Sequence, residues 1–162
     1  ALLQSNGAFR VKNWLTVSRR TGSSGVYRIA GGSLTVDLNL QLGEETNSNA
    51  RFEIVGTNAV IGCKTLVATT NATLRFEIAA GGVSKIAVQN QATLAGTLEV
   101  SVPYKLFKDT LTVIDAGSLS GRFNNVVPVH PLRTVDVTYD AATGNVTLSN
   151  FRYRVGTLLS VF

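Results

Sequence analysis

A four-residue motif occurs twice in this chain, as Arg51-Phe52-Glu53-Ile54 and again as Arg75-Phe76-Glu77-Ile78, 24 residues later. Similar segments in the same phase surround the two copies, at residues 25–29 upstream and 96–100 downstream. Sequence that returns at a fixed period of 20–50 residues is the signature of a solenoid or another repeat architecture. The strict alternation of apolar and polar residues inside each copy indicates β-strands rather than helices.

Small residues follow each of these segments, and a second alternating run comes next. After residues 25–29, for example, Ala30-Gly31-Gly32-Ser33 precedes Leu34-Thr35-Val36. Glycine allows a chain to bend at such corners because it has no Cβ to clash. A period of 22–25 residues built from three short strands fits one coil of a parallel β-solenoid, in which coils stack about 4.8 Å apart. A β-sandwich, which also has short strands and turns, is the main alternative.

If the copies stack in phase, the apolar members of each strand form columns inside the solenoid. One predicted column holds Phe52, Phe76 and Leu98, and the next holds Ile54, Ile78 and Val100.

The same phase places Glu53, Glu77 and Glu99 in an outward acidic column. Stacked carboxylates can bind a cation or act as an acid/base pair. The favoured interpretation is a charged outer face, in which Arg28, Arg51 and Arg75 form ion pairs with the glutamates.

The ends of the chain are less regular than its middle. Residues 7–17 resemble a first, shorter coil, and Pro103 is expected to close the regular repeat. Residues 135–148 predict an antiparallel hairpin around a glycine-containing loop, followed by an extended segment from Phe151 to Phe162. We therefore divide the chain into a solenoid, residues 1–127, and a C-terminal β extension, residues 128–162.

Composition limits the classes of function. The 162 residues carry a net charge of +5, but Lys and Arg are scattered, which favours a solvated basic surface over a nucleic-acid site. No apolar run approaches the roughly 20 residues of a membrane-spanning helix. The start at Ala1-Leu2-Leu3 resembles a chain processed by signal-peptide removal and predicts an extracellular or cell-surface location, although a trimmed chain or a fragment would look the same.

The sequence offers no catalytic, metal or cofactor site. Cys63 is the only cysteine, and its apolar neighbours favour a buried thiol over an intermolecular disulfide. His130 is the only histidine, and neither a metal-ligand cluster nor a nucleophile motif accompanies it. We therefore predict no catalytic residues, no metal and no cofactor.

Several phrases carry a resemblance to a known group of proteins. Gly31-Gly32-Ser33-Leu34-Thr35-Val36 and residues 92–100 resemble the strand-associated repeats of bacterial autotransporter passenger domains and of related exported β-helical surface proteins, and residues 109–123 resemble the segment that commonly ends such repeat arrays. The resemblance covers about residues 7–127. It implies a right-handed parallel β-helix in an extracellular or cell-surface setting, and it supplies no catalytic residues.

The leading functional hypothesis is a structural subunit of an extracellular fibre or surface assembly, a homopolymer that forms through solenoid ends and terminal strands. Open strand edges pair with other chains unless they are capped. The two chain ends are apolar instead of polar, which makes the following residues the candidates for assembly: Ala1, Leu2, Leu3, Phe151, Tyr153, Val155, Leu158, Leu159, Val161 and Phe162.

Two alternatives remain open. The first is an adhesin or carbohydrate-binding module of the passenger type, with polysaccharide or a cell surface as partner and Trp14, Tyr104, Phe107 or Tyr153 as candidate ligand contacts. The second is an enzyme that acts on polysaccharide, which would need a cluster of carboxylates and basic residues along one face.

Overall fold

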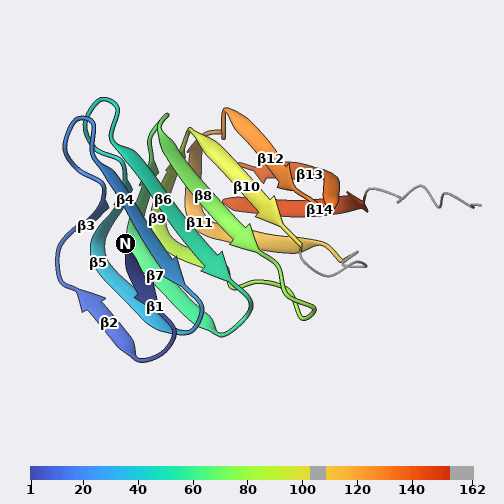
Figure 1. The fold of residues 1–162 in the computed structure, drawn as a ribbon, viewed down its shortest axis with the longest axis horizontal. Helices are drawn as coiled ribbons and strands as arrows, with labels where there is room; N and C mark the ends of the chain where they lie inside the picture. Colours follow the sequence, from blue (N-terminus) through green and yellow to red (C-terminus); the bar gives the residue numbers. More distant parts are fainter. Residues whose placement is uncertain (103–108, 154–162) are drawn as a thin grey trace, which may run out of the picture.

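The computed structural model describes residues 1–102 and 109–153 and shows a parallel β-solenoid of about five coils, with an antiparallel part near the C-terminus (Figure 1). Two sheets form its walls. One sheet has the order β1 (Leu2–Gln4), β4 (Ser24–Ile29), β6 (Asn49–Val55), β8 (Ala72–Glu77), β10 (Thr97–Ser101) and β12 (Asn125–Val129). The other has the order β13 (Leu132–Asp140), β14 (Asn145–Tyr153), β11 (Leu111–Gly121), β9 (Ile86–Leu94), β7 (Ala59–Ala68), β5 (Gly32–Leu42) and β2 (Ala8–Val11), with β3 (Leu15–Val17) also on β5.

The pairing confirms the solenoid and excludes the sandwich, because β1 to β12 pair in parallel throughout the described coils. Among the described coils, the expected three separate strands per coil are present only in the first coil, where β2 and β3 are two strands that both pair with β5. In later coils the second and third segments join into one bent strand. The register slips at the bend, for example between Val36 and Asn39 of β5.

The predicted columns are wrong by two residues. Phe52 pairs with Leu74 and Ile54 pairs with Phe76, because β6 and β8 align Ala50 with Ala72, 22 residues apart, and not the two copies of the motif. A slip of two residues keeps the same side chains inside, since the side-chain period of a strand is two. The inner columns are Tyr27, Phe52, Leu74 and Leu98, and beside them Ile29, Ile54, Phe76 and Val100. All eight side chains are buried.

The corners depend on glycine at defined points. Gly32 and Gly96 have positive φ angles of 80° and 73°. A Cβ on Gly32 would lie 2.2 Å from the carbonyl oxygen of Gly7, and one on Gly96 would lie 2.3 Å from that of Ala72. These glycines therefore allow both the left-handed turn and the close approach of the coil beneath.

The C-terminal hairpin is present, and it continues the wall of the solenoid. β13 and β14 pair antiparallel, and β14 pairs antiparallel with β11. The expectation that Pro103 closes the repeat is wrong, because β11 and β12 add parallel strands beyond it. The last of these runs to Val129. It tolerates Pro128 because, among the described residues, β12 lies at the edge of its sheet.

Candidate assembly site at the open N-terminal end

The first coil is paired on one side only. β1 pairs with β4, while β2 and β3 pair with β5, and within residues 1–102 and 109–153 no strand lies on their outer side. Three short strand edges therefore present backbone N–H and C=O groups at this end of the solenoid. Unpaired edges of this kind are templates for strand addition.

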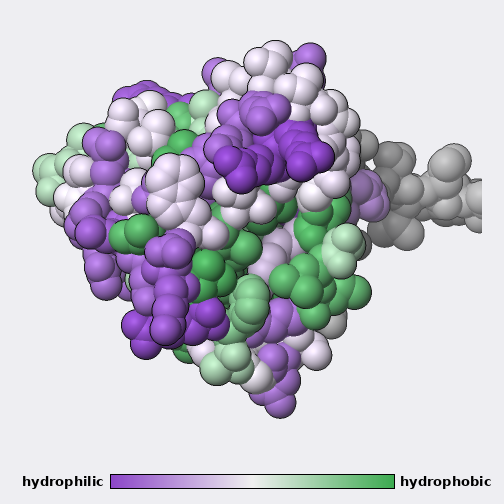
Figure 2. All heavy atoms as spheres, turned by 90° about the vertical axis from the view of Figure 1, so that its left-hand side faces the viewer, coloured by the Kyte–Doolittle hydropathy of each residue, from purple (hydrophilic) through white to green (hydrophobic). Residues whose placement is uncertain are grey.

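The inner columns also end here without a cover. Leu2 pairs with Tyr27 and Phe9 pairs with Leu34, so both occupy inward positions of the repeat. Yet the exposed fractions of Leu2 and Phe9 are 47% and 42%, against 2% for Tyr27 and 0% for Leu34. The two side chains occupy inward positions, and within residues 1–102 and 109–153 no strand covers them. Figure 2 shows apolar side chains gathered on this face.

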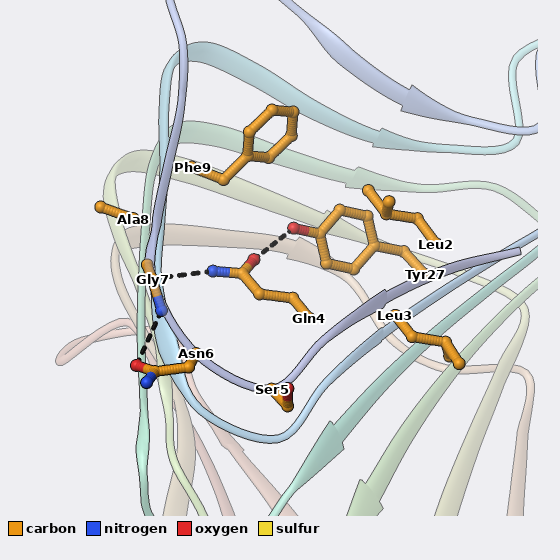
Figure 3. A pocket seen from close by; sticks show the side chains of 9 residues that line it. All are labelled: Leu2, Leu3, Gln4, Ser5, Asn6, Gly7, Ala8, Phe9 and Tyr27. Carbon is orange, nitrogen blue, oxygen red and sulfur yellow. Dashed lines mark hydrogen bonds between the residues drawn. The ribbon is translucent and has the colours of Figure 1, made fainter.

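A cavity of about 380 Å³ opens between these strands (Figure 3). The Tyr27 hydroxyl donates a hydrogen bond of 2.6 Å to the side-chain oxygen of Gln4, and the Gln4 amide donates to the carbonyl oxygens of Gly7 and Ser33 at 3.2 and 2.9 Å. Burial raises the pKa of Tyr27, which keeps its hydroxyl protonated and able to donate. Gln4 therefore satisfies the one polar group of a column that is otherwise apolar.

The first coil is rich in basic residues, and acidic side chains of the next coil accompany them. Arg10, Lys12, Arg19 and Arg20 all precede the first acidic residue, Asp37. The guanidinium of Arg10 forms a salt bridge with Asp37 at 3.1 Å, and that of Arg19 forms one with Glu44 at 3.0 Å. For Lys12 and Arg20, the described part of the chain shows no salt bridge.

The predicted assembly residues are placed as follows. Ala1, Leu2 and Leu3 lie at the open end and are exposed. Phe151 and Tyr153 lie in β14, where Phe151 is buried and Tyr153 pairs with Leu132, so both are engaged by the chain's own hairpin. Val155, Leu158, Leu159, Val161 and Phe162 lie outside the described residues, as do Tyr104 and Phe107, two of the candidate ligand contacts.

Sequence reasoning did not select Phe9 or Gln4 for this site. Phe9 lies 25 residues before Leu34, its partner on β5, so the period of the repeat could have marked it as an inward residue of the first coil. Trp14, a candidate ligand contact, is 54% exposed at the same end.

The predicted acidic column does not form. The two-residue slip places Arg28, Glu53, Arg75 and Glu99 in one outward column, so that positive and negative charges alternate from coil to coil. Arg28 contacts Glu53 at 2.8 Å, and Arg75 contacts Glu99 at 3.5 Å. Ion pairs therefore stand where a cation site or a carboxylate pair could have formed, which confirms the favoured interpretation of a charged outer face.

Arg51 links the column across three strands. It contacts Glu53 within its own strand, and its guanidinium donates two hydrogen bonds to Glu99, at 3.0 and 2.6 Å, over the intervening β8. Burial raises the pKa of Glu53, but hydrogen bonds from Arg51 and Arg28 outweigh it and leave that pKa below its ordinary value. The hydrogen bonds from Arg51 likewise lower the pKa of Glu99.

The remaining reactive residues are dispersed. Cys63 is buried, and its burial raises the pKa of the thiol to about 12, so the thiol is protonated and inert at neutral pH. His130 is exposed beside β12. The described residues contain no group of three or more His, Cys, Asp or Glu that could hold a metal ion, and no helix long and apolar enough to cross a membrane.

No family model and no curated protein matches this chain. The bacterial, exported and passenger-like part of the resemblance therefore stays a prediction.

Proposed function

We propose that this chain is a structural subunit of an extracellular fibre or surface assembly, and that copies join at the open N-terminal end. The single observation that carries the proposal is that the core is uncovered there. Leu2 and Phe9 occupy inward positions but keep 47% and 42% of their surface exposed. Fully burying a side chain of this size stabilises a contact by about 1.5–3 kcal/mol. Three unpaired strand edges add backbone hydrogen bonds to any strand placed on them.

Charge and symmetry favour an open chain of subunits. A two-fold contact between two N-terminal ends would set Lys12 and Arg20, which form no salt bridge in the described part of the chain, against their own copies, since Arg10 and Arg19 are already paired with Asp37 and Glu44. A contact between this end and a different surface of the next copy avoids that repulsion. Such heterologous contacts build filaments when the rotation does not close into a ring. The resemblance to exported β-helical surface proteins supports an extracellular setting for the fibre.

Sedimentation velocity and negative-stain electron microscopy over a wide concentration range test this function. We expect multimers that lengthen with concentration, and we expect Leu2→Asp to abolish them, because a carboxylate at the open column resists burial. The matched control is Val60→Asp, on the side of the solenoid, where the native side chain is 71% exposed and pairs with no end strand. A full-length protein that stays monomeric throughout contradicts the proposal.

One observation favours the alternative of a carbohydrate-binding module. The cavity combines an aromatic ring, Phe9, with the hydrogen-bonding groups of Gln4 and Tyr27, and small sites for polar ligands commonly have this composition. This function predicts a monomer whose Phe9→Ala variant loses binding to a glycan array. The fibre predicts no glycan binding at that cavity.

A further inference from the structure

We infer that residues 154–162 of one copy occupy the open N-terminal end of a second copy, as a donated strand. This inference rests on the proposed function and names both sides of the contact. The acceptor is the first coil, with its cavity and the edges of β1, β2 and β3. The donor is the segment that follows Tyr153, the last described residue of β14.

The acceptor calls for an extended, apolar partner. A strand laid on β1 gains backbone hydrogen bonds along its length, and every second side chain points into the solenoid. There it would cover Leu2 and Gln4, the members of the two inner columns that no layer covers. The lining of the cavity is largely apolar or uncharged, so a charged segment would be desolvated there without compensation.

The donor has the matching chemistry. Residues 158–162 read Leu-Leu-Ser-Val-Phe and carry no charge. In an extended strand, Leu159 and Val161 share one face while Leu158 and Phe162 share the other, so either face brings two large apolar side chains to the core. Gly156 separates this apolar run from the charged residues Arg152 and Arg154.

The apolar run of the donor, residues 158–162, cannot lie along the open end of its own solenoid, because its first residue does not extend that far. Five strand spacings separate β2 from β14, and at about 4.8 Å each they amount to about 24 Å. The five residues from Tyr153 to Leu158 span at most about 18 Å when fully extended. Figure 1 shows the end of β14 and the first coil at opposite ends of the molecule. A first coil on which the apolar run can lie therefore belongs to another copy.

The edge of β12, at the C-terminal end of the same chain, is obstructed. β14 lies between β11 and β13, and Tyr153 pairs with Leu132, the first residue of β13. A tail that returned to β12 would have to cross the connection from Val129 to Leu132, and protein chains avoid crossed connections at one edge of a sheet. Donation to a neighbour requires no crossing.

Complementation between two defective variants tests the assignment. A chain that lacks residues 154–162 keeps the acceptor but has no donor, and the Leu2→Asp chain keeps the donor but has a blocked acceptor. We expect each alone to sediment as a monomer, and their mixture to form a 1:1 dimer that does not grow further. Phe9→Asp serves as a second blocking variant, and circular dichroism verifies that each variant is folded.

Cross-linking locates the donor directly. We expect a bis-maleimide to join Ser160→Cys in one chain to Leu3→Cys in another. We expect it not to join Ser160→Cys to Val60→Cys, although Leu3 and Val60 are equally exposed at 71%. The buried Cys63 stays unmodified. An intramolecular link between Ser160→Cys and Val127→Cys would overturn the inference in favour of a tail folded onto its own β12.

The outcomes separate this inference from the proposed function. Filaments that still form without residues 154–162, or variants that fail to complement while the full-length chain assembles, would overturn the donor assignment and leave the fibre standing. A full-length chain that is monomeric at every concentration would overturn both.

Discussion

Glu53 is the residue on which the outer charge ladder depends most. It accepts hydrogen bonds from Arg28 in the coil below and from Arg51 in its own strand, and it faces Arg75 in the coil above. Exposed ion pairs contribute little individually, but this carboxylate is largely shielded and belongs to a network with Glu99 and Glu77. Replacing it leaves three arginines with fewer counter-charges.

The lowered pKa values of Glu53 and Glu99 predict a specific loss of stability in acid. A carboxyl group whose folded pKa is depressed stabilises the fold above its unfolded pKa and loses that contribution as the pH falls through the folded value. We expect the free energy of unfolding to decline below pH about 4.5, the ordinary value for glutamate. The decline should be smaller in Glu53→Gln than in the control Glu44→Gln, at an exposed pair near the open end. Urea titrations at a series of pH values on both sides of the ordinary glutamate pKa measure the decline, and equal slopes in both variants would contradict the prediction.

The burial of Phe76 allows a prediction of how much a truncated core side chain destabilises the fold. Its side chain is fully buried between Ile54 and Val100 of the neighbouring coils. We expect Phe76→Ala to lower the free energy of unfolding by about 3–5 kcal/mol, because it removes apolar contacts and leaves a cavity. Val60→Ala, on the exposed face of the same solenoid, should change it by about 0.5 kcal/mol or less. Chemical denaturation distinguishes the two, and comparable effects would contradict the described core.

At the level of elements, the sequence predicted which residues form strands and which side they bury, but not how neighbouring strands align. The alternation of apolar and polar residues determines which side chains point inward, and a slip of two residues leaves those side chains inside. The alternation therefore could not predict that Phe52 pairs with Leu74. The joining of two segments into β5 was missed because the bend at Asp37 and Leu38 carries no glycine or proline. The open end was predicted from Ala1, Leu2 and Leu3, whereas its cavity depends on Gln4 and Tyr27, which meet only through the coil.

The hairpin determines which C-terminal truncations should lower the melting temperature. Phe151 is 8% exposed and belongs to the hydrophobic core. We expect deletion of residues 154–162 to leave the melting temperature of the monomer nearly unchanged. Deletion of residues 151–162 also removes Phe151 and the end of β14, so the melting temperature should fall by several degrees, as a loss of about 1–3 kcal/mol implies. Differential scanning calorimetry compares the two, and equal melting temperatures would contradict this role of Phe151.

For the whole molecule, the two ends of the solenoid are not equivalent. The hairpin adds two antiparallel strands to one wall at the C-terminal end, while the described strands at the N-terminal end, β1, β2 and β3, are short and pair on one side only. Solenoids normally need capping units at both ends. An assembly that covers the first coil would cap an end that the described strands leave open.

Assembly should therefore stabilise the fold by mass action. Any partner that binds only the folded state raises its apparent stability with the logarithm of concentration. We expect the melting temperature of the full-length chain to rise with protein concentration, and that of Leu2→Asp to stay constant. Light-scattering-monitored melts at several concentrations measure this, and a constant melting temperature in the full-length chain would contradict it.

The two-residue slip between β6 and β8 also bears on how reliably the chain folds. The duplicated Arg-Phe-Glu-Ile motif offers a competing register, in which the two copies pair in phase. That register would still bury both phenylalanines. It would, however, place Glu53 against Glu77 and Arg51 against Arg75, and like charges directly opposite each other are destabilising. Exchanging Arg75 and Glu77 (Arg75→Glu with Glu77→Arg) reverses this preference, so we expect a lower refolding yield, measured by hydrogen exchange of β8. Unchanged protection of β8 would mean that packing alone selects the register. The surface charges of this solenoid thus select the native register during folding, because burial of the core residues does not distinguish it from the in-phase register.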